Sequence, residues 1–274
     1  MVLDGHIHLM NDRGSAADLV SRMGEAGIDG GILISRPPAC FAQLAEAAPP
    51  ARRLEQVLDW CAGRDRLFPF YWVDPLEADA LEQVEAAARA GVAGLKVICD
   101  RYRPGDARAL EVFAAIAGAN RPLMFHSGIL WDAKPSSYHN RPVEFEALLE
   151  VPGLRFSMAH ISWPWCDEMI AVYGKFQSAR RHRPELSVEL FVDTTPGTPP
   201  LYRREALTRL FTVGYDVHSN VFFGSDCTAD AYDLVYARQW LERDRGILED
   251  LGVGARVARN VFAGNLLRFL GREA

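Results

Sequence analysis

Short apolar, β-rich runs alternate with helical patterns along the whole chain, and this alternation restricts the possible folds more than any other feature of the sequence. Eight strands are predicted, at residues 2–9, 30–35, 67–74, 93–99, 122–128, 154–162, 186–193 and 220–226. Helices are predicted between them, for example at 76–90, and a last helix at 255–270. Such strands are parallel and joined by right-handed crossovers, and eight units close a barrel.

An open doubly wound sheet is the competing architecture. That sheet normally carries a glycine-rich phosphate loop after its first strand, but here Met10-Asn11-Asp12-Arg13 follows and no G-x-G-x-x-G occurs. A length of 274 residues also suits one (β/α)8 barrel, which typically takes about 250 residues. No linker, low-complexity tract or internal repeat divides the chain. We therefore expect a single (β/α)8 TIM barrel domain over residues 1–274.

The composition is that of an ordinary globular protein, with 49% hydrophobic and 24% charged residues. The net charge of -6 includes no basic block that could neutralise a phosphate backbone, so nucleic acid is not an expected partner. No apolar run approaches the roughly 20 residues that span a bilayer, and the chain opens directly on a strand. We expect a cytoplasmic protein with a small-molecule substrate and no membrane partner. A homodimer is expected only because dimers are the commonest oligomers of soluble proteins.

The first predicted strand ends in Asp4-Gly5-His6-Ile7-His8. Side chains alternate along a strand, so His6 and His8 point to the same face, which is the interior in a barrel. Two inward imidazoles at the C-terminal rim can bind one divalent cation. An isolated H-x-H is as often accidental or structural, so further ligand-type residues are needed to decide.

Such residues stand at the ends of later predicted strands: His126 in the fifth, His160 in the sixth and Asp226 in the eighth. Taken alone, each histidine could be a core residue, and Asp226 could cap the helix that follows. Active sites of (β/α)8 barrels are built at the C-terminal ends of the strands. The residues together therefore predict a metal centre at that rim.

With these residues in place, the sequence resembles the amidohydrolase superfamily, specifically the amidohydrolase-related branch that includes aminocarboxymuconate-semialdehyde decarboxylase. The resemblance covers almost the whole chain. It rests on the H-x-H pair, the two later histidines, Gly224-Ser225-Asp226 and the closing Gly264-Asn265-Leu266-Leu267-Arg268-Phe269. It implies one metal site with the ligands His6, His8, His126 and Asp226, beside which His160 orients or protonates the reacting group.

The resemblance implies one divalent metal ion, with zinc as the first choice and manganese as the alternative, because His and Asp ligands suit both. Such an ion lowers the pKa of bound water toward about 7. Asp226 would take the proton from that water, and His160 would stabilise an oxyanion or protonate the leaving group. Asp226 and His160 are therefore the predicted catalytic residues.

Lys96, near the end of the fourth predicted strand, has two possible roles. In binuclear members of the superfamily a carboxylated lysine at this place bridges two metal ions. In the reading we favour, Lys96 pairs with a substrate carboxylate or with a neighbouring acid. Trp131 and Arg141 after the fifth strand, and Trp163 after the sixth, are further predicted substrate contacts.

Two reactions fit this site. The first is hydrolysis of a small amide, ester or lactone, with or without a carboxylate, through metal-activated water. The second is non-oxidative, metal-dependent decarboxylation of an aromatic or muconate-like acid. The ligand set does not separate them, and hydrolysis is favoured because it is the commoner chemistry of the superfamily. A nuclease of the TatD type is disfavoured, since Gly224-Ser225-Asp226 replaces that family's Glu-Thr-Asp. Nothing supports a noncatalytic metal-binding barrel.

Overall fold

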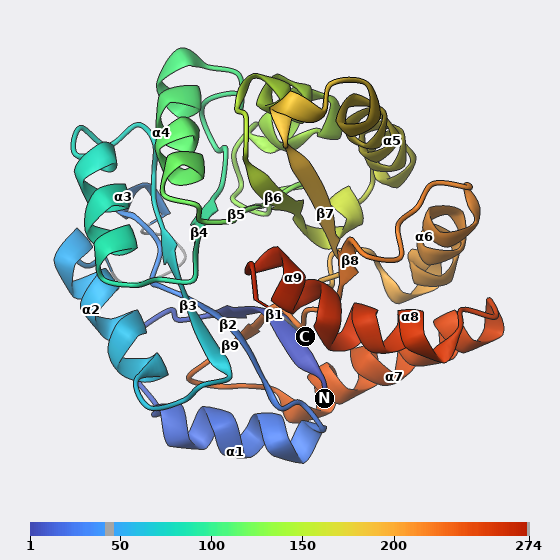
Figure 1. Cartoon of the computed structure of the whole chain (residues 1–274). Coiled ribbons are helices and arrows are strands. Elements are labelled where there is room, and N and C mark those ends of the chain that lie inside the picture. The colour runs from blue at the N-terminus through green and yellow to red at the C-terminus, as the bar shows by residue number, and fades with distance from the viewer. Residues whose placement is uncertain (42–46, 273–274) are drawn as a thin grey trace.

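Nine parallel strands form one sheet that curls into a barrel in the computed structural model, which describes residues 1–41 and 47–272 (Figure 1). The strand order is β8-β7-β6-β5-β4-β3-β2-β1-β9. The strands are β1 Leu3–His8, β2 Gly30–Ile34, β3 Leu67–Trp72, β4 Gly94–Val97, β5 Leu123–Phe125, β6 Arg155–Met158, β7 Glu189–Asp193, β8 Val221–Phe222 and β9 Cys227–Thr228. All eight predicted strands are confirmed, although each is shorter than predicted.

Of the eighth predicted strand, at 220–226, only residues 221–222 form a strand, which is β8. The strand β9 begins just after its predicted end, and β8 and β9 together close the barrel. β8 pairs with β7, whereas β9 pairs with β1. Between them the carbonyl of Phe223 accepts the N–H of Gly5 at 2.8 Å, and the N–H of Asp226 donates to the carbonyl of His6 at 2.9 Å. We call this contact between β1 and residues 223–228 the seam. Gly5 is required there, because a Cβ atom would lie 2.7 Å from the ring of Phe222.

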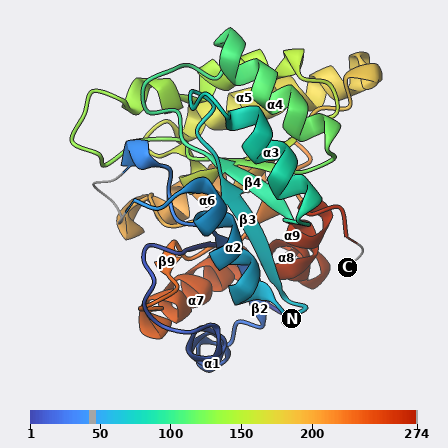
Figure 2. The same cartoon turned by 90° about the vertical axis from the view of Figure 1, so that its left-hand side faces the viewer.

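Helices surround the sheet (Figures 1 and 2). They are α1 Ala16–Ala26, α2 Pro50–Cys61, α3 Ala80–Arg89, α4 Ala107–Gly118, α5 Cys166–His182, α6 Pro200–Thr212, α7 Leu234–Asp250, α8 Ala255–Arg259 and α9 Asn265–Phe269. Short 3-10 segments lie at Ala39–Phe41, Ser137–Asn140, Pro142–Glu150, Ala159–Ser162 and Pro184–Leu186. Among the residues described, no helix combines the length and the apolar character needed to cross a bilayer.

Local sequence signals explain where the helices begin and end. α1 begins after Ser15, whose side chain caps the N–H of Asp18, and ends at Gly27, which adopts a φ of 81°. α3 begins four residues later than predicted, because Asp74 accepts the N–H of Leu76 in a turn that precedes it. The predicted last helix is confirmed as α8 and α9 joined by the π turn Asn260–Gly264.

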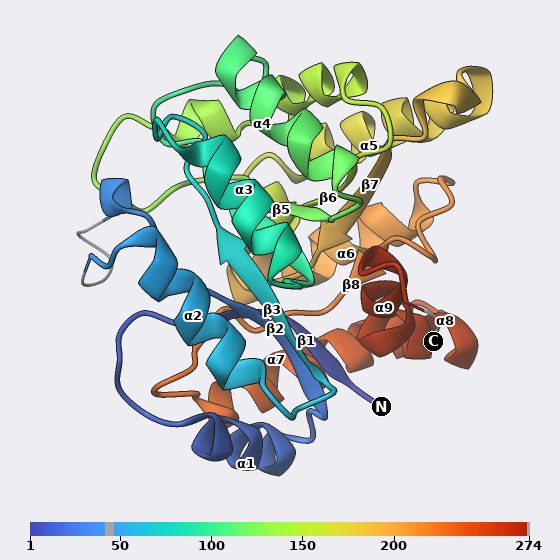
Figure 3. The same ribbon diagram turned by 60° about the vertical axis from the view of Figure 1, so that its left-hand side comes forward.

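Aromatic packing fills one end of the barrel and leaves the other end for the site. The ring of Phe269 in α9 lies against Phe70, Phe191 and Phe222 of three strands, with centroid distances of 6.2, 5.1 and 5.3 Å. Figure 3 shows α9 and the N-terminus on this side, away from the end at which the arrow of β3 points. The C-terminal ends of the strands therefore hold the open pocket.

A buried ion pair holds the loop that follows β7. Arg203 in α6 donates to Asp244 of α7 at 2.9 and 2.6 Å, and also to the carbonyl of Thr194. Both charged side chains are buried. In Arg203→Ala the carboxylate of Asp244 keeps its burial but loses its partner, so we expect the free energy of unfolding to fall by about 3–5 kcal/mol.

Urea denaturation of this variant measures that loss. Arg204→Ala is the matched control, because it removes an exposed pair with Asp250 and should change the free energy of unfolding by less than about 1 kcal/mol. Equal losses in the two variants would contradict a special role for the buried pair.

Candidate metal centre

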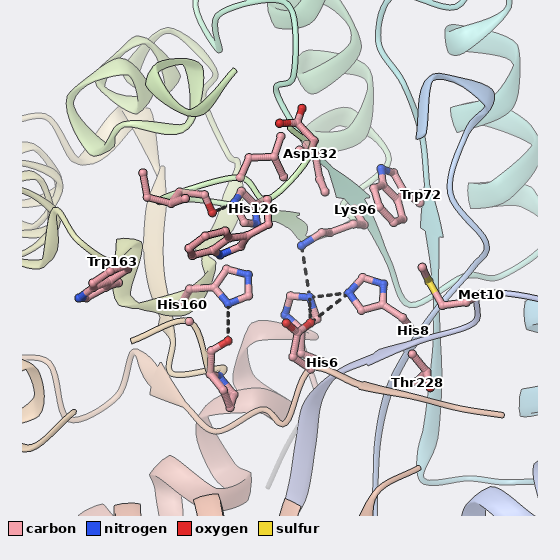
Figure 4. A pocket seen from close by; sticks show the side chains of 17 residues that line it. His6, His8, Met10, Trp72, Lys96, His126, Asp132, His160, Trp163 and Thr228 are labelled. Atoms are coloured by element: carbon pink, nitrogen blue, oxygen red, sulfur yellow. Dashed lines mark hydrogen bonds and ion pairs between the residues drawn. The ribbon is translucent and has the colours of Figure 1, made fainter. Parts of the chain in front are cut away.

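The C-terminal end of β1 and the seam bring three of the predicted ligands together (Figure 4). Nε2 of His6 and Nε2 of His8 are 3.1 Å apart, and Oδ1 of Asp226 lies 3.7 and 3.4 Å from them. The three donor atoms lie within 4.8 Å of one another. Two imidazole nitrogens and a carboxylate oxygen are ligands that zinc and similar divalent ions bind. The side chains present therefore fit one metal ion.

Asp193, the last residue of β7, determines which nitrogen of His6 faces this group. Its Oδ2 lies 2.7 Å from Nδ1 of His6, and both side chains are buried. A carboxylate accepts, so Nδ1 carries the proton and the lone pair of Nε2 is left for a cation. Burial and the charge of Lys96 hold the pKa of His6 well below its ordinary value, so the ring is neutral. Sequence reasoning missed Asp193, although an acidic residue at the end of a predicted strand was a usable signal.

Asp226 is the anionic member of the group. Its φ is +62°, a left-handed conformation, and 36% of its side chain is exposed. Burial alone would raise the pKa of Asp226, but the hydrogen bond from His8 is the largest of the opposing contributions, which together lower it well below its ordinary value. Asp226 is therefore ionised, as either a metal ligand or a general base has to be.

His126 and His160 line the same pocket but lie outside the group of three. Nε2 of His126 lies 3.1 Å from the carbonyl of Ile129, to which it donates, so Nδ1 is the atom left for an ion. His160 donates from Nδ1 to the carbonyl of Pro196 at 3.0 Å, which leaves Nε2 as an acceptor. The two ring centroids are 4.8 Å apart, and burial lowers the pKa of each ring. Both histidines are neutral at neutral pH.

A left-handed turn sets the direction of His160. The prediction that strand six continues to residue 162 is wrong: β6 ends at Met158, and φ is positive at His160 (63°), Ile161 (48°) and Ser162 (53°). This conformation costs roughly 1–2 kcal/mol per non-glycine residue. Buried hydrogen bonds help to offset the cost, since the hydroxyl of Ser127 lies 2.6 Å from that of Ser162 and 2.9 Å from the carbonyl of Ala159.

A cavity of about 370 Å³ opens beside the group of three. Most of its walls are apolar, and they include Met10, Trp72, Ile98, Ile129, Leu130 and Trp163. Lys96 is buried in it, with Nζ 3.4 Å from Nε2 of His6, and burial lowers the pKa of this amine to about 8. Trp131 also lines the cavity, although 78% of its side chain is exposed. Three of the four predicted substrate contacts, Lys96, Trp131 and Trp163, thus meet here.

The fourth predicted contact, Arg141, is not among the residues that line this cavity. Its Nε donates to Glu168 at 2.9 Å, and its guanidinium lies 5.7 Å from the ring centroid of Trp165. The 3-10 segment Ser137–Asn140 precedes Arg141, and the pair with Glu168 ties the arginine to α5. The structure therefore does not bring Arg141 together with the other candidates.

Comparison with known proteins identifies the family. The sequence profile of the family described as amidohydrolase matches residues 4–272. No curated protein sequence matches the chain. The fold is similar to that of 2,6-dihydroxybenzoate decarboxylase from Rhizobium, at 13% identity and a TM-score of 0.64 over 98% of each chain.

Two further solved structures have the same fold. One is an amidohydrolase from Burkholderia multivorans with bound zinc, at 12% identity and a TM-score of 0.64 over 99% of each chain. The other is a probable 2-pyrone-4,6-dicarboxylic acid hydrolase from Acinetobacter baumannii, at 11% identity and a TM-score of 0.60 over 98% of this chain and 99% of that one. Hydrolases and a decarboxylase thus share this barrel. Because the family profile spans nearly the whole sequence, the chain belongs to the amidohydrolase family.

Proposed function

We propose that this protein is a metal-dependent hydrolase of a small amide, ester or lactone. One observation carries the proposal: His6, His8 and Asp226 direct three donor atoms at one another beside an open cavity. A divalent ion bound there supplies a water molecule of lowered pKa and polarises the scissile carbonyl. We propose zinc as that ion, with manganese as the alternative, and His126 as a further ligand through Nδ1.

Asp226 and His160 have different roles in the proposed reaction. Asp226 is ionised and partly exposed, so it takes a proton from the attacking water and returns it to the leaving group. Nδ1 of His160 is protonated and donates to the carbonyl of Pro196. Nε2 is therefore unprotonated and accepts a hydrogen bond from the water or from a substrate N–H or O–H. His160 therefore orients the reacting group in this tautomer.

The walls of the cavity favour a substrate with an apolar body and one carboxylate. Lys96 supplies a cation, and no arginine lines the cavity among the residues described. Trp131 and Trp163 offer aromatic surface to the rest of the substrate. We propose that Lys96 binds the carboxylate while the tryptophans contact the apolar part.

Decarboxylation of an aromatic or muconate-like acid is the second candidate, and the same apolar cavity favours it. A carboxylate among these apolar walls is poorly hydrated, which promotes the loss of carbon dioxide, and the carbon that loses it then takes a proton from water. A structure of similar fold is titled 2,6-dihydroxybenzoate decarboxylase. The two reactions are distinguished by their products, since only decarboxylation releases carbon dioxide.

A panel of lactones, esters, amides and aromatic acids, incubated with zinc-loaded protein, tests both candidates. Hydrolysis products are followed by mass spectrometry, and carbon dioxide is followed by a coupled assay. Hydrolysis without release of carbon dioxide supports our first proposal. Carbon dioxide release with no lactone, ester or amide turned over would replace it by the second, and full metal content with neither activity would contradict both.

We expect one metal ion per chain and an unmodified Lys96. Among the residues described, the donor atoms that gather within 4.8 Å of one another are those of His6, His8 and Asp226, and His126 and His160 do not belong to this group. Elemental analysis gives the metal stoichiometry, and labelling with ¹³C-bicarbonate detects a carbamate on the lysine. Two ions per chain together with a carbamate signal would establish the binuclear alternative instead.

A further inference from the structure

One carboxylate on the first strand is hydrogen-bonded on three sides at the seam. Asp4 and Tyr232 are completely buried. Oδ1 of Asp4 accepts the backbone N–H of His6 at 3.0 Å and the backbone N–H of Ser225 at 2.8 Å, and Oδ2 accepts the hydroxyl of Tyr232 at 2.9 Å. His6 belongs to β1, whereas Ser225 belongs to residues 223–228 on the other side of the seam, and Tyr232 follows these residues in the chain. The Asp4 carboxylate therefore connects the two sides.

Both backbone groups that Asp4 binds lie at the metal centre. His6 is a candidate ligand, and Ser225 immediately precedes another, Asp226. The N–H groups of Ser225 and Asp226 are both fixed on β1, the first by the Asp4 carboxylate and the second by the carbonyl of His6 at 2.9 Å. A left-handed residue such as Asp226 costs about 1–3 kcal/mol and persists only where its surroundings determine it. Asp4 is one of the groups that provide this constraint.

We propose that Asp4, held in place by Tyr232, is a positioning residue that sets the separation between the His6 and His8 ring nitrogens and the carboxylate of Asp226. Asp4 does not ligate the ion. Its two Oδ1 bonds hold His6 and Ser225 in a fixed register, so the ligands from the two sides of the seam meet at one point. The inference rests on the proposed metal site and adds a determinant of its affinity.

If the hydrogen bonds of Asp4 and Tyr232 only stabilised the fold, their loss would have a different effect from the one we propose. Loss of a buried hydrogen bond lowers stability wherever it occurs, but only a positioning residue changes the zinc affinity of protein that remains folded. Tyr71→Phe is the matched control for Tyr232→Phe. Tyr71 is also buried, and its hydroxyl donates to Gln83 at 2.7 Å, between β3 and α3 and outside the residues that line the metal cavity.

The experiment measures zinc dissociation constants by competition with a chromophoric chelator, together with thermal unfolding of the zinc-free proteins. We expect Tyr232→Phe and Asp4→Asn to bind zinc about 10-fold more weakly or worse, as is usual when a residue that orients metal ligands is changed. Tyr71→Phe should bind zinc like the wild type while its melting temperature falls. The cobalt-substituted Tyr232→Phe protein should also show a shifted visible absorption spectrum, because the ligand geometry changes.

Wild-type zinc affinity and an unshifted cobalt spectrum in Tyr232→Phe would overturn the inference. If Asp4→Asn does not fold, Tyr232→Phe decides alone, since it changes one hydroxyl group. The failure of the wild-type protein to bind zinc or cobalt would instead overturn the proposed metal site itself, and the inference with it. The two kinds of failure are therefore distinguishable.

Discussion

Replacing His6 and His8 together by Ala is expected to reduce bound metal from one ion per chain to background. The substitutions remove two of the three donor atoms that lie within 4.8 Å of one another, and the remaining carboxylate of Asp226 is a weak site alone. Elemental analysis after dialysis against a zinc buffer measures the loss. Circular dichroism checks that the variant is folded, because Asp193 keeps its burial but loses its partner His6.

The control for this experiment replaces two histidines away from the site. His182 and His218 are exposed, and His182→Ala combined with His218→Ala should retain the full metal content. Metal bound at wild-type stoichiometry by the His6 and His8 double variant would contradict the ligand assignment. Loss of metal from the control variant would show that histidine number, and not position, governs binding.

Asp226→Asn is expected to lower turnover by about 10²–10⁴-fold, the usual contribution of a general base. The amide keeps the shape of the side chain and one oxygen, but it cannot take a proton from water. Metal content should fall less than in the double histidine variant, since both ring nitrogens remain. Steady-state kinetics on the substrate found by the panel, corrected for the metal content of each preparation, gives the ratio.

Asp132→Asn is the matched control, because Asp132 lines the same cavity yet its Oδ1 is bound by Ser136 and the N–H of Lys134. We expect this variant to change turnover far less. Equal turnover in wild type and Asp226→Asn at equal metal content would remove Asp226 from the role of base. Equal losses in the two variants would mean that the charge of the cavity, and no single carboxylate, is what matters.

Features that depend on the alternation of side chains were predictable from the sequence. The period of two along the first strand correctly places His6 and His8 on one face. The same period would place Asp4 on that face as well, but a register irregularity between Asp4 and Ile7 turns Asp4 to the opposite face, where it meets Tyr232. An acidic residue also ends the seventh predicted strand, at Asp193. The spacing of metal ligands alone does not reveal Asp4 or Asp193, because these carboxylates act on the ligands and are not ligands themselves.

Features that depend on the sign of a backbone φ angle, or on how a loop packs against distant segments, were not predictable from the sequence. Nothing in the residue types of His160, Ile161 and Ser162 indicates three positive φ values, because such a turn is held by contacts with distant segments such as Ser127. The pair between Arg141 and Glu168 likewise depends on how the loop after β5 packs on α5. Periodicity describes single elements, whereas these contacts join several.

Closure of the barrel at the seam has a consequence for biosynthesis. His6 and His8 are synthesised long before Asp226, because nearly all of the strands and helices of the barrel lie between them in the sequence. The complete ligand set exists only after the last strand has docked beside the first. The group of three donor atoms therefore cannot form before residue 226 has been synthesised, and a product that stops before this residue carries an incomplete set of them.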